Sequence, residues 1–180
     1  VTPVPSGPVW KEEIPEIEEQ CRLGFAGGLF SYEDKKFFEG AVVAVDSSFF
    51  KMFGVPLLKG DPDHILNEPN TMVISEEIAE KYFGDEEAMG KSIKVDNEEF
   101  YTVTGIMKKM RSNSNIQADI LLPWSYRKAQ IYYNDSWGNN SIGTMVKLTE
   151  GAIDSIVNRK ITEVTNIHKE GNTILFEVKP

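Results

Sequence analysis

The 180-residue chain is poor in the side chains that most often carry chemistry, since it contains one cysteine, Cys21, and two histidines, His64 and His168. A single cysteine excludes an internal disulfide, and Cys21 lies in a strand-like run where it is expected to be a small core residue. Nucleotide-binding glycine loops, nucleophile elbows, paired cysteines and histidine zinc motifs are missing as well. The sequence therefore predicts no catalytic, cofactor-binding or metal residues, and the chain is not expected to be an enzyme.

Positive charge and long apolar runs are also scarce. The chain has 19 Lys and Arg against 28 Asp and Glu, a formal net charge of −9, so its surface should repel nucleic acid rather than bind it. No apolar run approaches the ~20 residues that cross a bilayer. The sequence begins at Val1-Thr2-Pro3 without an initiating Met or a signal peptide, which is typical of a segment excised from a longer protein.

What is present is an ordinary apolar content of 41%, arranged in short periodic segments that predict a packed globular domain. Strands are expected at 17–25, 29–32, 36–45, 72–74, 118–123, 142–148 and 173–178, and as a hairpin at 91–95 and 100–108. Helices are expected at 6–14, where Ser6 can cap the first turn, and at 47–54, 76–83, 124–133 and 153–167. This order of strands and helices favours an α+β sandwich with helices on one face of a mixed sheet.

Two of these helices carry the clearest signals. Ser75 can cap the amides of the helix at 76–83, Glu76 and Glu77 suit the positive end of its dipole, and Gly84 can take the left-handed position after it. The other helix has an apolar stripe at helical spacing, formed by Ile153, Ile156, Val157, Ile161, Val164 and Ile167. A charge in the middle of that stripe should be poorly tolerated.

The few polar groups that could form a site lie in one turn. Asp61, Asp63 and His64 place two carboxylates and an imidazole within four residues, a set that could hold a divalent metal for a hydrolase. Asp-Pro-Asp is also ordinary turn chemistry. His168 is expected to end a helix, where the helix dipole favours a cation.

Aromatic side chains leave a second functional alternative open. Phe37, Phe38 and the cluster from Phe49 to Phe53 could line a pocket for an apolar ligand, a lipid or a lipoprotein. Aromatic residues at this density are more often core. Phe49, Phe50 and Phe53 are therefore interpreted as packing residues of a lobe.

The strongest signal for a family is an ordered set of short motifs between residues 46 and 123. The motifs are Phe49-Phe50-x-x-Phe53, Leu57-Leu58-x-Gly60-Asp61-Pro62, Glu68-Pro69-Asn70 ahead of Val73-Ile74-Ser75, Ala79-x-Lys81-Tyr82-Phe83-Gly84, Gly90-Lys91 and Thr102-Val103-Thr104-Gly105-Ile106. In this order they resemble the extracytoplasmic domain of MacB-like ABC transporter permeases, a group that includes FtsX-like and lipoprotein-releasing permeases. The residues of the Pro-Asn and Lys-Tyr-Phe-Gly motifs are most similar to those of permeases of the Bacteroidetes kind.

This resemblance implies a fold and a function. It implies that residues 1–180 are a domain held on the periplasmic side of the inner membrane, between the first and second transmembrane helices of a permease. The implied fold is a porter-like α/β sandwich lobe, built from the N- and C-terminal parts, with a smaller β-rich lobe inserted between them. The implied role is to carry motion driven by ATP hydrolysis outward, as in efflux, without binding ATP and without chemistry of its own.

The resemblance also implies partners. These are a separate cytoplasmic ABC ATPase, reached through the membrane part of the permease, and a second permease copy in a dimer. A membrane fusion protein or a lipoprotein is a further candidate partner in the periplasm. The cargo is not implied by any motif in the chain.

Overall fold

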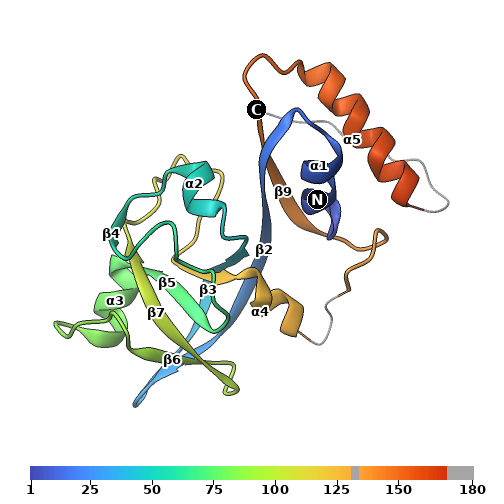
Figure 1. Ribbon diagram of the computed structural model, residues 1–180. Helices are drawn as coiled ribbons and strands as arrows, with labels where there is room; N and C mark the ends of the chain where they lie inside the picture. Colours follow the sequence, from blue (N-terminus) through green and yellow to red (C-terminus); the bar gives the residue numbers. More distant parts are fainter. Residues whose placement is uncertain (131–133, 170–180) are drawn as a thin grey trace. The chain divides into compact units, whose positions relative to one another are not determined.

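The computed structural model describes residues 1–130 and 134–169 (Figure 1). Within that range the chain forms two compact units. Unit 1 combines residues 1–22 with residues 134–169, and unit 2 comprises residues 23–130. Strand β2 (Ile17–Tyr32) begins in unit 1 and ends in unit 2, so the two units share one continuous strand.

Unit 2 is built on a mixed sheet with the strand order β2-β3-β8-β5-β7-β4, and β6 pairs with both β2 and β7. Besides β2, its strands are β3 (Lys35–Val45), β4 (Leu57–Lys59), β5 (Thr71–Ser75), β6 (Ser92–Val95), β7 (Glu99–Met107) and β8 (Ile120–Pro123). The pairs β3/β8 and β5/β7 are parallel, and the remaining pairs are antiparallel. The mixed sheet and the hairpin of β6 and β7 predicted from the sequence are confirmed.

The central strands of this sheet are buried on both faces. Residues 42–45 of β3, 72–74 of β5 and 120–122 of β8 are each at most 1% exposed. Neighbouring side chains of a strand point to opposite faces, so an unbroken buried run requires cover on both sides. These runs therefore form the centre of the unit 2 core.

Helix α3 (Glu76–Phe83) has the N-cap that its sequence predicts, since the Ser75 hydroxyl accepts a hydrogen bond from the Ile78 amide at 3.3 Å. Gly84 follows the helix with φ 60° and ψ −126°, a positive φ that favours glycine but not the left-handed helical conformation that the sequence predicts. Ile78 and Tyr82 are buried in one apolar cluster with residues of the sheet. The helix therefore packs one face of the sheet, and its bounds agree with the prediction.

Unit 1 contains β1 (Thr2–Pro3) and β9 (Asn140–Leu148) beside the first residues of β2, in the order β1-β9-β2. Helices α1 (Ser6–Glu13) and α5 (Asp154–His168) lie side by side (Figure 1). Trp10 of α1 donates from Nε1 to the hydroxyl of Thr165 in α5 at 2.9 Å, and both residues are buried. The apolar core of this unit consists of Trp10, Ile14, Ile17, Val157 and Ile161.

The glycines of β2 do not end the strand. The prediction of separate strands at 17–25 and 29–32 is wrong, because β2 and β3 stay paired past Ala26 through a register shift before Gly28. A Cβ on Gly27 would lie 3.0 Å from the ring of Phe38, and one on Gly28 would lie 3.0 Å from the carboxylate of Asp96. These glycines allow neighbouring side chains to approach the backbone closely, and they do not form a turn.

Three helix ends also differ from the sequence predictions. The chain is already helical at Pro5, so Ser6 lies inside α1 and makes no cap hydrogen bond. Helix α4 (Trp124–Ala129) is shorter than predicted. In α5, Ile153 and Ile167 are 58% and 76% exposed, since the first precedes the helix and the second lies in its last turn. The predicted strand at 173–178 lies outside the described residues.

The burial of α5 predicts a position-dependent effect of charge. Ile161 is 2% exposed and Ile167 is 76% exposed on the same helix. The substitution Ile161→Asp should reduce the free energy of unfolding by about 3 kcal/mol or more, because it removes a buried side chain and buries a carboxylate. Ile167→Asp should change it by less than about 0.5 kcal/mol. Urea denaturation of both variants tests this, and equal midpoints would contradict the placement of α5.

Candidate functional site

Asp61, Asp63 and His64, the residues that could have held a metal, lie in an exposed turn. The imidazole Nδ1 of His64 donates to Asp61 Oδ2 at 2.7 Å, and the backbone N–H of Asp63 donates to Asp61 Oδ1 at 3.1 Å. The side chains of Asp61 and His64 are 60% and 81% exposed. Across residues 1–130 and 134–169 no group of three His, Cys, Asp or Glu side chains is placed to hold a metal ion. The geometry here is that of a turn stabilised by its own aspartate.

The contact shifts the pKa values of its two partners in opposite directions. The hydrogen bond to Asp61 raises the pKa of His64, and the same bond lowers the pKa of Asp61. The charged form of the pair is therefore fully present below the ordinary pKa of histidine and above that of aspartate. It is lost as the pH rises through the raised pKa of His64 or falls through the lowered pKa of Asp61.

His168 lies in the last turn of α5, as the sequence predicts. Its Nε2 is 2.7 Å from Glu13 Oε1 of α1, and its ring stacks on Trp137 with 5.0 Å between ring centroids. The imidazole is thus engaged by neighbouring segments of unit 1. Cys21, the other reactive side chain, is fully buried, in agreement with its predicted core position.

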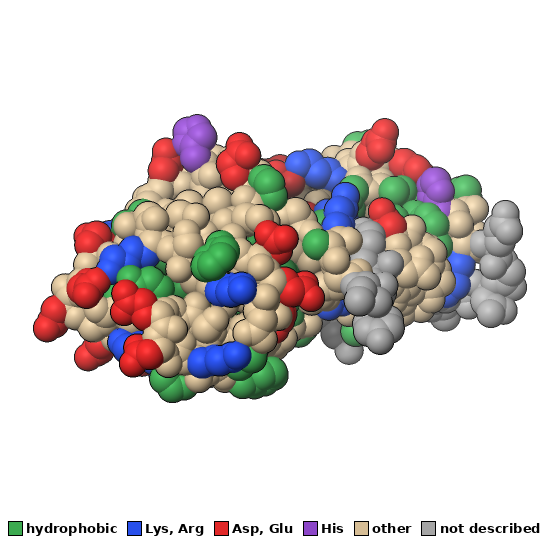
Figure 2. All heavy atoms as spheres, turned by 90° about the horizontal axis from the view of Figure 1, so that it is seen from below, with side chains coloured by type: hydrophobic (Ala, Val, Ile, Leu, Met, Phe, Trp, Pro, Cys, Tyr) green, Lys and Arg blue, Asp and Glu red, His purple; other side chains and the backbone are tan. Residues whose placement is uncertain are grey.

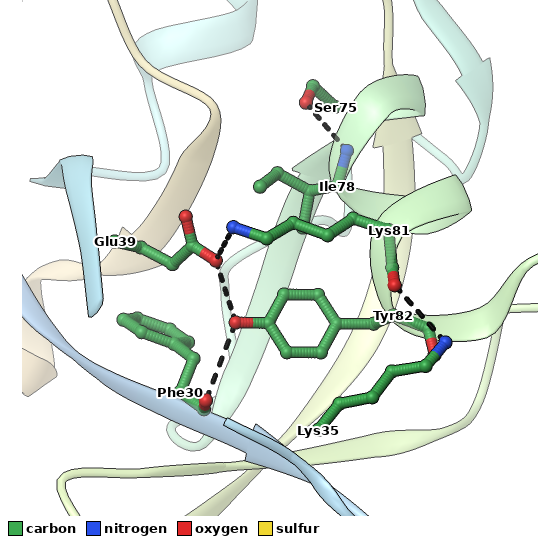
Figure 3. A network of polar contacts seen from close by, with 7 residues as sticks. All are labelled: Phe30, Lys35, Glu39, Ser75, Ile78, Lys81 and Tyr82. Atoms are coloured by element: carbon green, nitrogen blue, oxygen red, sulfur yellow. Dashed lines mark hydrogen bonds and ion pairs between the residues drawn. The ribbon is translucent and has the colours of Figure 1, made fainter. Parts of the chain in front are cut away.

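A partly buried polar network fastens α3 to the strands β2 and β3 (Figure 3). The Tyr82 hydroxyl donates to Glu39 Oε1 at 2.7 Å, and Lys81 Nζ donates to the same oxygen at 2.6 Å. The Phe30 carbonyl lies 3.4 Å from the Tyr82 hydroxyl. Lys35 Nζ donates to the carbonyls of Tyr82 and Lys81, at 2.7 and 3.2 Å, at the C-terminal end of the helix. Figure 3 shows these side chains converging from three elements.

This network holds α3 against β2 and β3. Burial, followed by the hydrogen bond to the Glu39 carboxylate, raises the pKa of Tyr82, so the phenol stays protonated and donates a hydrogen bond to Glu39. The carboxylate is neutralised by Lys81. Tyr82 therefore acts in this network as a hydrogen-bond donor between α3 and β3.

The aromatic cluster predicted from the sequence divides into a buried and an exposed part. Helix α2 (Phe49–Phe53) buries Phe49 and Phe50, whereas Phe53 is 37% exposed and lies 4.9 Å from Phe49 between ring centroids. Phe37 and Phe38 are on strand β3, where they are 39% and 72% exposed. The structure therefore does not bring the two aromatic groups into one pocket.

A groove of about 600 Å³ lies between α2 and the segment that follows β7. Phe49 and Phe53 line it from the helix, and Met110 and Ile116 line it from the segment. The sequence predicts the aromatic side of this groove but not the opposite side, because residues 111–117 are rich in Ser and Asn and are typical of a polar loop. The one signal on that side is the pair of apolar residues, Met110 and Ile116, which are 9% and 6% exposed.

The rim of this groove is cationic. Lys108, Lys109 and Arg111 line it, and none of the twelve described residues that form it is acidic. Lys109 is paired with Glu77 through two contacts of 2.7 and 2.8 Å, which raise the pKa of Lys109. On the face that Figure 2 presents, acidic and basic side chains are interspersed and apolar side chains form small separate groups.

The fold is shared with domains that transport proteins hold outside the cytoplasm. A domain assigned to a permease protein from Porphyromonas gingivalis is 28% identical, with a TM-score of 0.78 over 94% of this chain and 72% of that chain. The periplasmic region of MacB from Actinobacillus actinomycetemcomitans is 16% identical, with a TM-score of 0.69 over 93% and 75%. The extracellular domain of the ABC-type transporter YknZ from Gram-positive bacteria has a TM-score of 0.67 at 14% identity, over 93% and 83%.

The chain belongs to the family of MacB-like periplasmic core domains, whose model matches residues 4–164. The macrolide export ATP-binding/permease proteins MacB of two Neisseria meningitidis strains are 25% identical to it over 143 residues, which is 77% of this chain. The chain spans about a fifth of the length of these relatives, 21%. The resemblance read from the motifs and the α+β fold class are thereby confirmed. No helix within the described residues is long and apolar enough to cross a membrane.

The network around Tyr82 predicts a matched pair of tyrosine substitutions. Tyr82→Phe removes the donor to Glu39 and leaves a partly buried carboxylate with one partner fewer, so the free energy of unfolding should fall by about 1–3 kcal/mol. Tyr101 is similarly buried, but its hydroxyl has no hydrogen-bond partner among the described residues. Tyr101→Phe should therefore cost less than about 0.5 kcal/mol. Urea denaturation compares the two, and equal losses would contradict the assigned role of Glu39.

Proposed function

We propose that this chain is the periplasmic domain of an ABC transporter permease in the inner membrane, and that it transmits conformational change without catalysing a reaction. The observation that carries the proposal is the family match over residues 4–164. ATP is hydrolysed by a cytoplasmic ATPase, two permease copies act as a dimer, and the domain passes the motion to a periplasmic partner such as a membrane fusion protein or a lipoprotein, or to the substrate.

The internal construction of the domain supports a mechanical role. Polar groups that would otherwise be candidates for chemistry are engaged in structural contacts, as Tyr82 and Glu39 are in unit 2 and His168 and Glu13 are in unit 1. Both units contain a packed apolar core of their own. A continuous strand, β2, contributes hydrogen-bonded residues to both units. We propose that this strand transmits displacement between the units, because stretching a paired strand breaks its ladder hydrogen bonds. We also propose that the N- and C-terminal parts form the porter-like lobe.

The proposed placement can be tested on the full-length protein. Its sequence is expected to contain four apolar spans of ~20 residues, one before this segment and three after it. A full-length protein carrying alkaline phosphatase within the exposed turn at Asp34 should show phosphatase activity in intact cells, because that enzyme is active only outside the cytoplasm. An active permease whose fusion is inactive, or a full sequence without these spans, would contradict the proposal.

Coupling to ATP can be tested separately by spin labelling. A thiol-reactive spin label can be attached to the variant Asp34→Cys, in the exposed turn between β2 and β3. Cys21 is fully buried, so within residues 1–130 and 134–169 only the new cysteine should be labelled. In the full-length dimer, the distance between the labels of the two copies should change between the nucleotide-free and the ATP–vanadate states. A complex assembled with an ATPase that cannot bind ATP is the control and should show no change. Identical distances in an actively hydrolysing complex would rule out transmission through this domain.

A further inference from the structure

The groove beside α2 combines two surfaces of different chemistry. Its floor is apolar and is formed by Phe49, Met110 and Ile116, which are 1%, 9% and 6% exposed. Phe53 stands at its edge with 37% of its surface exposed. The volume of about 600 Å³ is within the range of small-molecule sites, ~300–1,000 Å³. An apolar molecule in this space would gain by covering Phe53, because removing apolar surface from water is favourable.

The residues that follow α2 continue the lining of the groove. Gly54 ends α2 with a φ of 57°, a conformation that favours glycine, and a Cβ placed there would meet nothing within 4 Å. The next residues, Val55 and Pro56, continue the lining toward β4. The chain that follows the helix thus forms one part of the groove wall.

The cations of the rim are not all used within the fold. Glu77 engages Lys109, whereas Lys108 and Arg111 form no ion pair with any residue in 1–130 or 134–169. Both are exposed. In a chain with a formal net charge of −9, two uncompensated cations and a third paired one beside an apolar floor create a local site of opposite sign to the molecule as a whole.

We propose that this groove binds a small amphipathic anion, with its apolar body on Phe53 and Met110 and its acidic head on Lys108 and Arg111. Charge complementarity selects an anion over a neutral or cationic molecule of the same size. Lysine and arginine both bind carboxylates and phosphates, so either head is compatible with the rim. The proposal concerns this chain by itself and does not depend on the transmission of motion.

Nuclear magnetic resonance of the 180-residue chain tests the site with defined probes. Decanoate and decyl phosphate, each below its micelle concentration, should shift the backbone amide signals of Phe53, Gly54 and residues 108–111 in a saturable way. Comparison of the two identifies the preferred head group. Decanol and decyltrimethylammonium have the same apolar chain without the negative charge, and each should bind at least tenfold more weakly.

Matched substitutions separate the charged rim from general surface charge. The double substitution Lys108→Gln/Arg111→Gln should weaken decanoate binding at least tenfold. The control Lys36→Gln/Lys128→Gln removes the same charge from exposed positions elsewhere in unit 2 and should change it less than twofold. Signals outside the groove show that each variant is folded. Equal binding of decyltrimethylammonium, equal effects of the two double variants, or shifts that do not saturate would overturn the proposal.

Discussion

Burial of both faces of the central strands is the constraint on which unit 2 depends. Residues 42–45, 72–74 and 120–122 are almost completely removed from water, although they belong to strands that are distant in sequence. Strands with apolar side chains on both faces are stable in water only when both faces are covered. Helix α3 meets this requirement on one face, and the contact of Tyr82 with Glu39 fixes the helix to the neighbouring hairpin. The rest of the unit, including the groove beside α2, is arranged around this core.

Local signals explain which parts of the fold were predictable from the sequence. Helix α3 was predictable to the residue because Ser75 and Gly84 act within one turn of its ends. The continuity of β2 was not, because Gly27 and Gly28 are usually strand breakers. The strand is held there by other segments: β3 pairs with it on both sides of the register shift, and the carboxylate of Asp96 accepts from the Leu29 amide at 2.9 Å. Such contacts appear only when separate segments meet.

The same distinction applies to the candidate site. The sequence identifies Phe49 and Phe53 as an aromatic group that could line a pocket, but the opposite wall comes from a segment more than fifty residues later, whose composition is polar. Asp61, Asp63 and His64 show the reverse case. They are close together in sequence and could have formed a metal site, but in the structure they form only a turn. The prediction of the family depended on neither group of residues. It depended on the order of short motifs between residues 46 and 123, and the family model over residues 4–164 confirms it.

The division of the chain into units has a consequence for folding during synthesis. Unit 2 is a single continuous stretch, whereas unit 1 needs segments from both ends of the chain. The N-terminal segment with Trp10 therefore leaves the ribosome long before Val157 and Ile161, its core partners in α5, have been made. Unit 2 can fold in the interval, as domains generally do while synthesis continues. Once folded, it replaces a long flexible loop with a compact connector, which reduces the entropy lost when unit 1 closes.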